Sequence, residues 1–440
     1  MRLATVVAIA CLSASVGNAA TEWKAGVAKL AITPREPIWL AGFAVRTHVS
    51  EGVRADLLAE ALALADDSGK PAVVVTLDLV TMDRETADRI AEECRALYGV
   101  ARERLVLNVS HTHSGPVAGV SLMPLYVLTP DQQQTIHRYT ERLIRQTVGV
   151  VGAAIGRMAP ATISFQQGLA GIAVNRRRVW QRSLPGPVDH DVPVLSVRDS
   201  AGALMAVVVG YACHATALND YLISGDWPGY AREAIEKAHP GVTALFVQGC
   251  GADSNALPRK GEDLARLHGE VLAAAVEQVL VAKQSAIRPP LRAALERVDL
   301  PLEHLATREE LEKRARDPKP EIRGPAQSLL AVLARDGKLP DRCSYPVQVW
   351  QFGGLKFIAL GGEVVVDYSL RLKRTYGFES TWVAGYSNDL PGYIPSRRVR
   401  EEGGYEGGDA LVYFGQPGVF ASAVEEIIVN KVADLVSRTQ

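Results

Sequence analysis

The sequence predicts an α/β fold in which a layered, mixed or parallel β-sheet core is flanked by helices. Six short apolar runs are rich in β-branched residues, which is typical of strands that are buried on both faces. Longer segments between them carry the helical spacing of apolar residues, and this alternation indicates a layered α/β protein. The predicted strands are 72–76, 104–109, 204–211, 243–247, 357–360 and 382–386, and the predicted helices are 84–97, 135–151, 229–238, 261–279, 364–373 and 420–436.

The first twenty residues have the three-part pattern of a secretory signal peptide. Arg2 supplies a positive start, residues 3–12 are apolar, and the segment then becomes small and polar up to Ala20. The apolar stretch is too short to cross a bilayer permanently. We therefore expect a signal peptide at residues 1–20, a secreted or periplasmic protein, and a single domain over residues 21–440.

The balance of charge excludes nucleic acid as a leading partner. Lys and Arg number 48 against 49 Asp and Glu, and no basic run of five or more residues occurs. Several catalytic motifs are also absent from the sequence: the Gly-x-Ser-x-Gly elbow, His-Glu-x-x-His, the phosphate loop and the dinucleotide-binding glycine motif. Familiar serine-hydrolase and nucleotide chemistry therefore has no support.

Residues 303–342 interrupt the alternating pattern with a charged stretch. It contains two helical pieces separated by Pro318 and Pro320. We interpret this stretch as a solvated helical excursion rather than as a partner site.

Four cysteines remain after the predicted cleavage, and they lack CxxC spacing, so neither a zinc knuckle nor a redox pair is indicated. We expect buried free thiols, and one disulfide stays possible in an oxidising compartment. These residues are Cys94, Cys213, Cys250 and Cys343.

Polar and acidic residues gather directly after the predicted strands. Ligands of open α/β sheets bind outside the carboxyl ends of strands, so these residues are candidates for one site. Each has a structural alternative, because a lone histidine is more often a satisfied interior residue and an acidic residue before a helix is more often a cap. Together, two or three imidazoles and a carboxylate suit a first-row metal such as zinc. The candidates are His111, His113, His214, Asp226, Asp253, Asn255, Glu363 and Tyr393.

His111 and His113 lie two residues apart just past a predicted strand. At strand spacing, residues i and i+2 point to the same side, so both imidazoles are expected to face one site. Small neighbours, including Ser114 and Gly115, leave room for a ligand. The apolar segment 117–128 that follows either walls a pocket for an acyl chain or packs as ordinary core, and we leave both readings open.

The chain resembles the neutral/alkaline non-lysosomal ceramidases, which are zinc-dependent amidases that split ceramide into sphingosine and a fatty acid. The resemblance covers nearly all of residues 21–440, which it makes a single ceramidase-like catalytic domain. It is carried most specifically by the motifs Ser110-His-Thr-His-Ser-Gly-Pro116, Cys213-His-Ala-Thr216, Ser224-Gly-Asp226, Gly362-Glu363, Gly392-Tyr393 and Gly404-Tyr-Glu-Gly407.

The resemblance implies a role for each candidate residue. Zinc ligands are implied at His111, His214, Glu363 and Tyr393. His113 corresponds to a proton-transfer group, and Arg176 of the pair Asn175-Arg176 to an arginine that lines the pocket. We also expect Asp78 and Asp226 to orient the ligand imidazoles.

Two departures from the family pattern leave the substrate open. The family's Gly-Asp-x-Ser-Pro loop reads Ala252-Asp253-Ser254-Asn255-Ala256 here, so Asn255 replaces a serine that has been argued to be the nucleophile. The sequence also stops where family members continue into an immunoglobulin-like domain. We include Asp253 and Asn255 with His113 and Arg176 as candidate catalytic residues.

These observations predict a secreted zinc-dependent amidohydrolase that cleaves ceramide or a related N-acyl lipid by metal-activated water. Its partner would be a small-molecule N-acyl lipid, with at most peripheral membrane contact and no nucleic acid. Two alternatives remain: a zinc hydrolase of a different, non-lipid amide or ester, and an inactive metal-bound binding protein.

Overall fold

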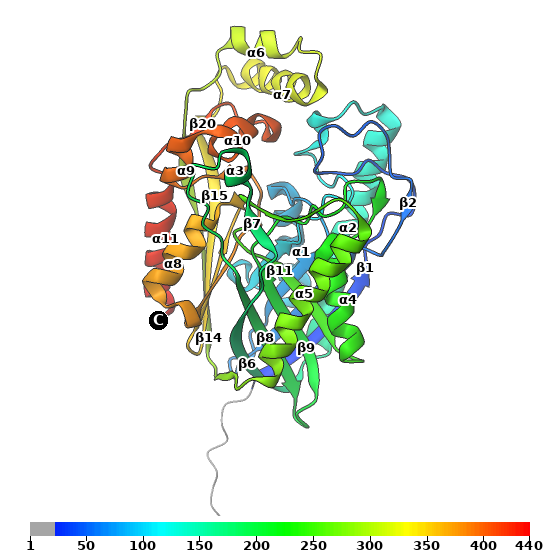
Figure 1. Ribbon diagram of the computed structural model, residues 1–440, viewed down its shortest axis with the longest axis vertical. Helices are drawn as coiled ribbons and strands as arrows, with labels where there is room; N and C mark the ends of the chain where they lie inside the picture. The colour runs from blue at the N-terminus through cyan, green and yellow to red at the C-terminus, as the bar shows by residue number, and fades with distance from the viewer. Residues whose placement is uncertain (1–22) are drawn as a thin grey trace, which may run out of the picture.

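Two β-sheets that face each other form the centre of the computed structural model, which describes residues 23–440 (Figure 1). The predicted signal peptide at residues 1–20 lies outside the described residues. The larger sheet has nine strands, with β13 (Ser285–Ile287) paired to β6 off the main path. The order along that path is β11 (Thr243–Gln248), β9 (Leu204–Tyr211), β8 (Asp191–Asp199), β6 (Ala159–Leu169), β1 (Trp23–Ala31), β3 (Leu58–Ala65), β4 (Ala72–Leu77) and β5 (Leu105–Val109).

The smaller sheet has five strands and packs its inner face on the larger sheet. Its order is β18 (Thr381–Ala384), β16 (Leu355–Leu360), β15 (Arg342–Phe352), β14 (Leu291–Glu303) and β20 (Val419–Phe420). Aromatic side chains fill the space between the sheets, and the Trp382 ring of β18 stacks on the Phe165 ring of β6 with 6.1 Å between centroids. This burial removes a large apolar area from water, which stabilises the pairing of the sheets.

Helices cover the outer faces of both sheets, so the molecule has four layers (Figure 1). Because apolar layers cover both faces of the larger sheet, β4, β5 and β11 are buried along their whole length, even though β5 and β11 end the strand order. The predicted α/β fold with helices flanking a sheet core is confirmed. The helices over the larger sheet are α1 (Arg84–Tyr98), α2 (Pro130–Gly156), α4 (Asp226–Ala238) and α5 (Glu262–Val281), and those over the smaller sheet are α8 (Val366–Tyr376) and α11 (Val424–Thr439).

The long strands run mostly antiparallel, and three pairs of them are parallel: β4 with β5, β9 with β11, and β16 with β18. Parallel neighbours end at the same edge of a sheet, so the loops that follow the two strands of each pair begin side by side. Three pairs of short strands lie in the connections between the long strands: β2 (Gly52–Val53) with β10 (Leu222–Ile223), β7 (Ala173–Asn175) with β12 (Ser254–Ala256), and β17 (Glu363–Val364) with β19 (Tyr393–Ile394).

The fully buried side chain of Asn108 ties the three parallel pairs together near their carboxyl ends. Its Oδ1 accepts a hydrogen bond from the Gln248 backbone N–H at 2.8 Å, at the end of β11. Its Nδ2 donates to the Gly385 carbonyl at 2.8 Å, just after β18. An amide can accept and donate at once, which lets one residue of β5 hold two other strand ends.

The charged stretch after β14 contains α6 (Arg308–Arg314) and α7 (Pro320–Asp336), and these helices share a small apolar cluster that includes Leu311 and Leu329. Helix α7 packs on two 3₁₀ segments, η2 (Met123–Leu125) and η4 (Asp409–Phe414). At Gly324, a Cβ would lie 1.8 Å from the Pro124 carbonyl oxygen, so this close approach requires glycine. The excursion therefore caps one end of the molecule (Figure 1).

Three further short helices are α3 (Arg176–Trp180), α9 (Arg397–Glu402) and α10 (Gly404–Gly407), and the remaining 3₁₀ segments are η1 (Arg102–Arg104) and η3 (Phe378–Ser380). The four cysteines of the described chain are buried free thiols. No helix within residues 23–440 has both the length and the apolar character needed to cross a membrane.

Replacing Asn108 with alanine should destabilise the fold by about 2–4 kcal/mol, because the Gln248 N–H and the Gly385 carbonyl would lose their partner while buried. Urea unfolding measures this change. Asn430→Ala, on an exposed position of α11, is the matched control and should shift the free energy of unfolding by less than about 0.5 kcal/mol. Equal stability of the two variants would contradict the role given to Asn108.

Candidate metal centre

Loops that leave the three parallel pairs carry the predicted metal ligands. His111 and His113 follow β5, His214 follows β9, and Glu363 follows β16. Tyr393 pairs with Glu363 in the parallel register of β17 and β19. The structure therefore brings all four predicted ligands and His113 to the carboxyl ends of the strands, where the sequence predicted the site.

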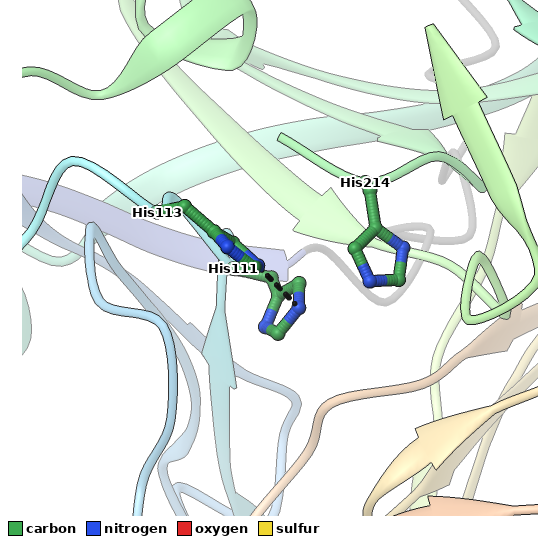
Figure 2. Close-up of side chains that lie close together, drawn as sticks. All are labelled: His111, His113 and His214. Carbon is green, nitrogen blue, oxygen red and sulfur yellow. Dashed lines mark hydrogen bonds between the residues drawn. The ribbon is translucent and has the colours of Figure 1, made fainter. Parts of the chain in front are cut away.

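The arrangement of His111 and His113 has a different origin from the one that the sequence suggested. Strand β5 ends at Val109, and His111 adopts a left-handed φ of 60°, so strand alternation does not align the two rings. The chain turns instead, and this turn brings the Nε2 atoms of the two rings within 3.1 Å of each other (Figure 2). Both rings do face one site, as expected, but the turn at His111 and not strand alternation brings them together.

Backbone carbonyls orient the rings of His111 and His214. His111 Nδ1 lies 2.6 Å from the Val80 carbonyl oxygen, and His214 Nδ1 lies 2.8 Å from the Gly251 carbonyl oxygen. A carbonyl only accepts hydrogen bonds, so each Nδ1 must carry the proton. In the neutral form of either ring, Nε2 then presents a lone pair to the site. This arrangement is common among metal-ligating histidines.

Both of these Nε2 atoms lie 3.2 Å from Oε2 of Glu363. Burial alone would raise the pKa of this carboxyl, but the positive charges and hydrogen bonds that His111 and His214 supply when they are protonated outweigh burial and hold the pKa well below its ordinary value. The Tyr386 hydroxyl lies 3.4 Å from the same oxygen. Glu363 therefore stands at the centre of the cluster as a carboxylate.

Tyr393 completes the set with its hydroxyl oxygen 3.3 Å from His214 Nε2. Burial, followed by the charge of Glu363, raises the pKa of this phenol well above its ordinary value. The neighbouring ring of His214 is affected in the opposite sense, because burial and the charge of Arg176 lower its pKa to about 4. Near neutral pH, His214 is therefore uncharged.

The donor set fits a divalent cation. Lone pairs of two imidazoles face a negatively charged carboxylate oxygen in a buried space, and these groups repel one another. A cation between them would attract all three groups and so stabilise the arrangement. The three histidines alone offer nitrogen atoms within 4.8 Å of one another. Imidazole nitrogen and carboxylate oxygen are ligands that zinc and neighbouring first-row metals accept.

His113 differs from the other two histidines in how its ring is held. Its Nδ1 is buried and has no hydrogen-bond partner, whereas the other two rings are anchored at Nδ1. The ring packs edge-on against Phe43 at 4.8 Å between centroids, and a Cβ at Gly42 would come within 2.4 Å of it. Burial and the charges of the other histidines hold the pKa of His113 well below its ordinary value. These features suit proton exchange better than structural anchoring.

Arg176 lies beside the predicted ligands. Its Nη2 donates to the Tyr393 hydroxyl oxygen at 3.1 Å, and its Nε donates to Oε1 of Glu406 at 2.6 Å. Its guanidinium also lies over the ring of Tyr405, 5.5 Å from the centroid. The predicted arginine therefore lines the site, and the carboxylate that holds it comes from the Gly404–Gly407 segment.

Asp253 and Asn255 occupy different positions relative to a cavity that opens beside His214 and Arg176. The Asp253 carboxylate is buried behind the cavity, where it accepts hydrogen bonds from the Val366 N–H and the Asn175 side chain, both at 2.9 Å. Its backbone carbonyl also accepts from the Arg176 N–H at 2.7 Å. Asn255 instead lines the cavity, next to His214. Asp253 thus positions the loop that carries Arg176, and only Asn255 faces the space where a substrate could lie.

Asp78 and Asp226 do not orient the ligand imidazoles, so that expectation was wrong. Asp78 pairs with the buried Arg232. The carboxylate of Asp226 accepts from the backbone N–H groups of Ala217, Leu218 and Trp227. Both carboxylates are occupied in holding loops behind the site, and the carbonyls described above orient the rings.

A cleft with two lobes opens over the cluster. An apolar lobe of about 250 Å³ is lined by Leu122, Leu125, Tyr413 and Phe414 together with His111 and Glu363. A polar lobe of about 500 Å³ is lined by Arg176, Thr216, Asn255 and Arg259 together with His214. The lobes share the residues Gly42, Phe43, His113, Tyr393 and Tyr405.

Residues 117–128 were expected either to form the wall of an acyl-chain pocket or to pack as ordinary core. Leu122 and Leu125 line it, while Val117 and Ala118 are buried in the core beneath. The segment therefore contributes both a pocket wall and ordinary packing.

Sequence reasoning missed several residues that shape the site. Tyr386 falls at the end of a predicted strand, but its φ of 50° turns it out of the strand and toward Glu363. Arg46 donates from Nη2 to the His113 carbonyl at 2.9 Å, and no local motif marks it. Glu406 was noted only as part of the Gly404–Gly407 motif, and the sequence did not indicate that it binds Arg176. These contacts join segments far apart in the chain, which no spacing rule reveals.

Replacing His111 or His214 with alanine should remove the bound metal, because each substitution deletes one anchored Nε2. His113→Ala should retain most of it, because the ring of His113 is not anchored at Nδ1. Elemental analysis of the purified variants measures the metal content. Full retention in His111→Ala or His214→Ala would reject the ligand assignment.

Comparison with known proteins identifies the family. Residues 23–262 match the family model described as neutral/alkaline non-lysosomal ceramidase, N-terminal. Neutral ceramidase A of Dictyostelium discoideum is 27% identical over 221 residues, which are 46% of this chain and 30% of the relative. Neutral ceramidase of Oryza sativa subsp. japonica is 22% identical over 285 residues, which are 60% of this chain and 34% of the relative. The chain thus spans about a third of the length of these curated relatives.

Solved structures share the fold. The crystal structure of neutral ceramidase from Pseudomonas aeruginosa is 20% identical with a TM-score of 0.71, covering 93% of this chain and 75% of that one. A ceramidase complexed with C2 is 17% identical with a TM-score of 0.73, covering 94% and 75%. Because the family model matches more than half of the sequence, the chain belongs to the neutral/alkaline non-lysosomal ceramidase family.

Proposed function

We propose that this protein is a zinc-dependent amidohydrolase that cleaves the amide bond of ceramide or a related N-acyl lipid. Family membership supports hydrolysis of such an amide. The observation that carries the proposal is the position of the cluster, which lies where an apolar lobe and a polar lobe meet. An N-acyl lipid has this same division, with an acyl chain on one side of the amide and a polar group on the other.

His111, His214, Glu363 and Tyr393 would hold the ion, because their donor atoms converge within hydrogen-bonding distances of one another. A bound zinc ion supplies Lewis acidity, which polarises a carbonyl and lowers the pKa of water. The Glu363 carboxylate supplies a negative charge here, and backbone carbonyls fix the orientation of the two neutral imidazoles. A substrate carbonyl would enter through the part of the cleft that both lobes share.

His113 is placed to move the proton. Its ring lines both lobes, and its lowered pKa keeps the ring unprotonated near neutral pH, so the ring is free to accept a proton from an attacking water. The same ring can then donate that proton to the departing amine. Arg46 fixes the backbone at this residue through the His113 carbonyl, at 2.9 Å.

Arg176 and Tyr393 would stabilise the negative charge that develops on the carbonyl oxygen. The Arg176 guanidinium already donates to the Tyr393 hydroxyl oxygen, so both groups are oriented before a substrate arrives. Donors that are fixed in advance stabilise a transition state most effectively. Glu406 keeps Arg176 in this place through the 2.6 Å hydrogen bond.

Direct attack by water fits this site better than a covalent serine route. Asn255 stands at the family's serine position, and no serine lines either lobe within residues 23–440. Ser254 is fully buried one residue earlier. An asparagine side chain can hydrogen-bond a substrate but is a poor nucleophile.

We also propose that the protein acts outside the cytoplasm. The three-part pattern of residues 1–20 supports export.

The proposal predicts chelator-sensitive hydrolysis of N-acyl amides. Incubation with a chelator should abolish release of fatty acid from ceramide or a shorter N-acyl amine, and added zinc should restore it. Mass spectrometry of both products provides the measurement. Protein that is fully loaded with zinc yet hydrolyses no amide or ester would instead favour a binding role.

Asn255→Ala should retain measurable hydrolysis, within about a hundredfold of the parent, if water attacks directly. His113→Ala should lose far more, about a thousandfold, because proton transfer of this kind contributes 10²–10⁴-fold. Initial rates at equal metal content compare the variants. Complete loss of activity in Asn255→Ala, with fold and metal intact, would indicate a direct chemical role for that loop.

A further inference from the structure

The polar lobe contains three arginines, and only two of them are neutralised by carboxylates. Arg176 pairs with Glu406 at 2.6 Å, and Arg177 pairs with Glu406 at 2.9 Å and with Glu402 at 3.1 Å. Glu402 and Glu406 are the two acidic residues among those that line the lobe, and both are therefore occupied. Within the described residues, the polar contact of the Arg259 side chain is with the Thr216 hydroxyl, and no carboxylate lies within salt-bridge distance of it.

Arg259 is held at the wall of the lobe by a neutral contact. Its Nη1 donates to the Thr216 hydroxyl at 3.3 Å, and that hydroxyl in turn lies 3.4 Å from Oδ1 of Asn255. The side chain is half-buried. Burial, followed by the charge of Arg176, lowers the pKa of Arg259.

The chain of contacts from Arg259 leads to the metal centre. Asn255 forms a parallel bridge with His214, whose Nε2 points at Glu363. The Arg259 guanidinium has several N–H donors, and the Thr216 hydroxyl engages one of them. The other donors are available to a group that occupies the lobe. The guanidinium fork matches the two oxygens of a carboxylate or a phosphate.

We propose that Arg259 determines specificity by binding an anionic group, a carboxylate or a phosphate, on the amine portion of the substrate. This inference rests on the proposed function, because it assumes that the amide lies between the two lobes. With the acyl chain in the apolar lobe, the amine portion occupies the polar lobe and reaches Arg259. A substrate of this class is an N-acylated amino acid or an N-acylated phosphoamine, and neutral ceramide would be the poorer substrate.

Two matched pairs of substrates test the inference and distinguish the two anions. N-lauroylglycine is compared with neutral N-lauroylglycinamide, and N-lauroyl phosphoethanolamine with neutral N-lauroylethanolamine. The parent protein should favour the anionic member of at least one pair by about tenfold or more in kcat/KM, because hydrogen bonds between ionised partners are stronger than those between neutral ones. The pair that shows the preference identifies the anion.

Arg259→Gln should abolish that preference by raising KM for the anionic substrate, with kcat and the neutral substrates little changed. Arg259→Lys should keep part of the preference, because it retains the charge but loses the fork. Arg292→Gln, at an exposed position on β14, is the matched control and should behave like the parent protein. Thermal unfolding of each variant checks that the fold is intact.

Equal rates for both members of each pair with the parent protein would overturn the inference, as would a preference that persists in Arg259→Gln. If no compound is hydrolysed, the proposed function fails, and calorimetric binding of the same four compounds then tests Arg259 by itself. Tighter binding of an anionic member that is lost in Arg259→Gln would support the inference, and equal binding would overturn it.

Discussion

The structure depends on one electrostatic arrangement, in which two imidazole lone pairs and a carboxylate oxygen face each other in a buried space. His111 and His214 donate from Nδ1 to backbone carbonyls. In the neutral form of each ring, the Nε2 atom therefore carries a lone pair, and this lone pair faces Glu363. Groups of this kind, buried without a balancing charge, are costly unless a cation joins them. The fold around the cluster is organised to hold this otherwise repulsive geometry.

Parallel strand pairs explain how such distant residues meet. Each pair ends at a common edge, and Asn108 links the three edges through its hydrogen bonds to Gln248 and Gly385. The largely antiparallel remainder of the sheets supplies the packing that makes these edges rigid. Because the two lobes of the cleft share His113 and Tyr393, the same framework places a reactive amide between an apolar and a polar environment.

The sequence alone predicted the layers and the clustering of ligands at strand ends, because buried strands such as β4 and β11 are nearly continuous apolar runs. It did not reveal β14, whose charged residues alternate with apolar ones in a pattern that also suits a helix. The start of α2 was placed five residues late, because its polar first turn is marked by a capping box at Thr129 rather than by apolar spacing. Contacts between distant segments, such as Arg46 with His113, leave no local signal.

The account can be tested most directly by locating the ion in a crystal. An anomalous difference map collected at the zinc absorption edge should show one strong peak within about 2.0–2.2 Å of the Nε2 atoms of His111 and His214 and an oxygen of Glu363. Tyr393 should complete the coordination. A peak held by other residues, or a cluster bridged only by water and protons in protein that contains zinc, would contradict the central claim.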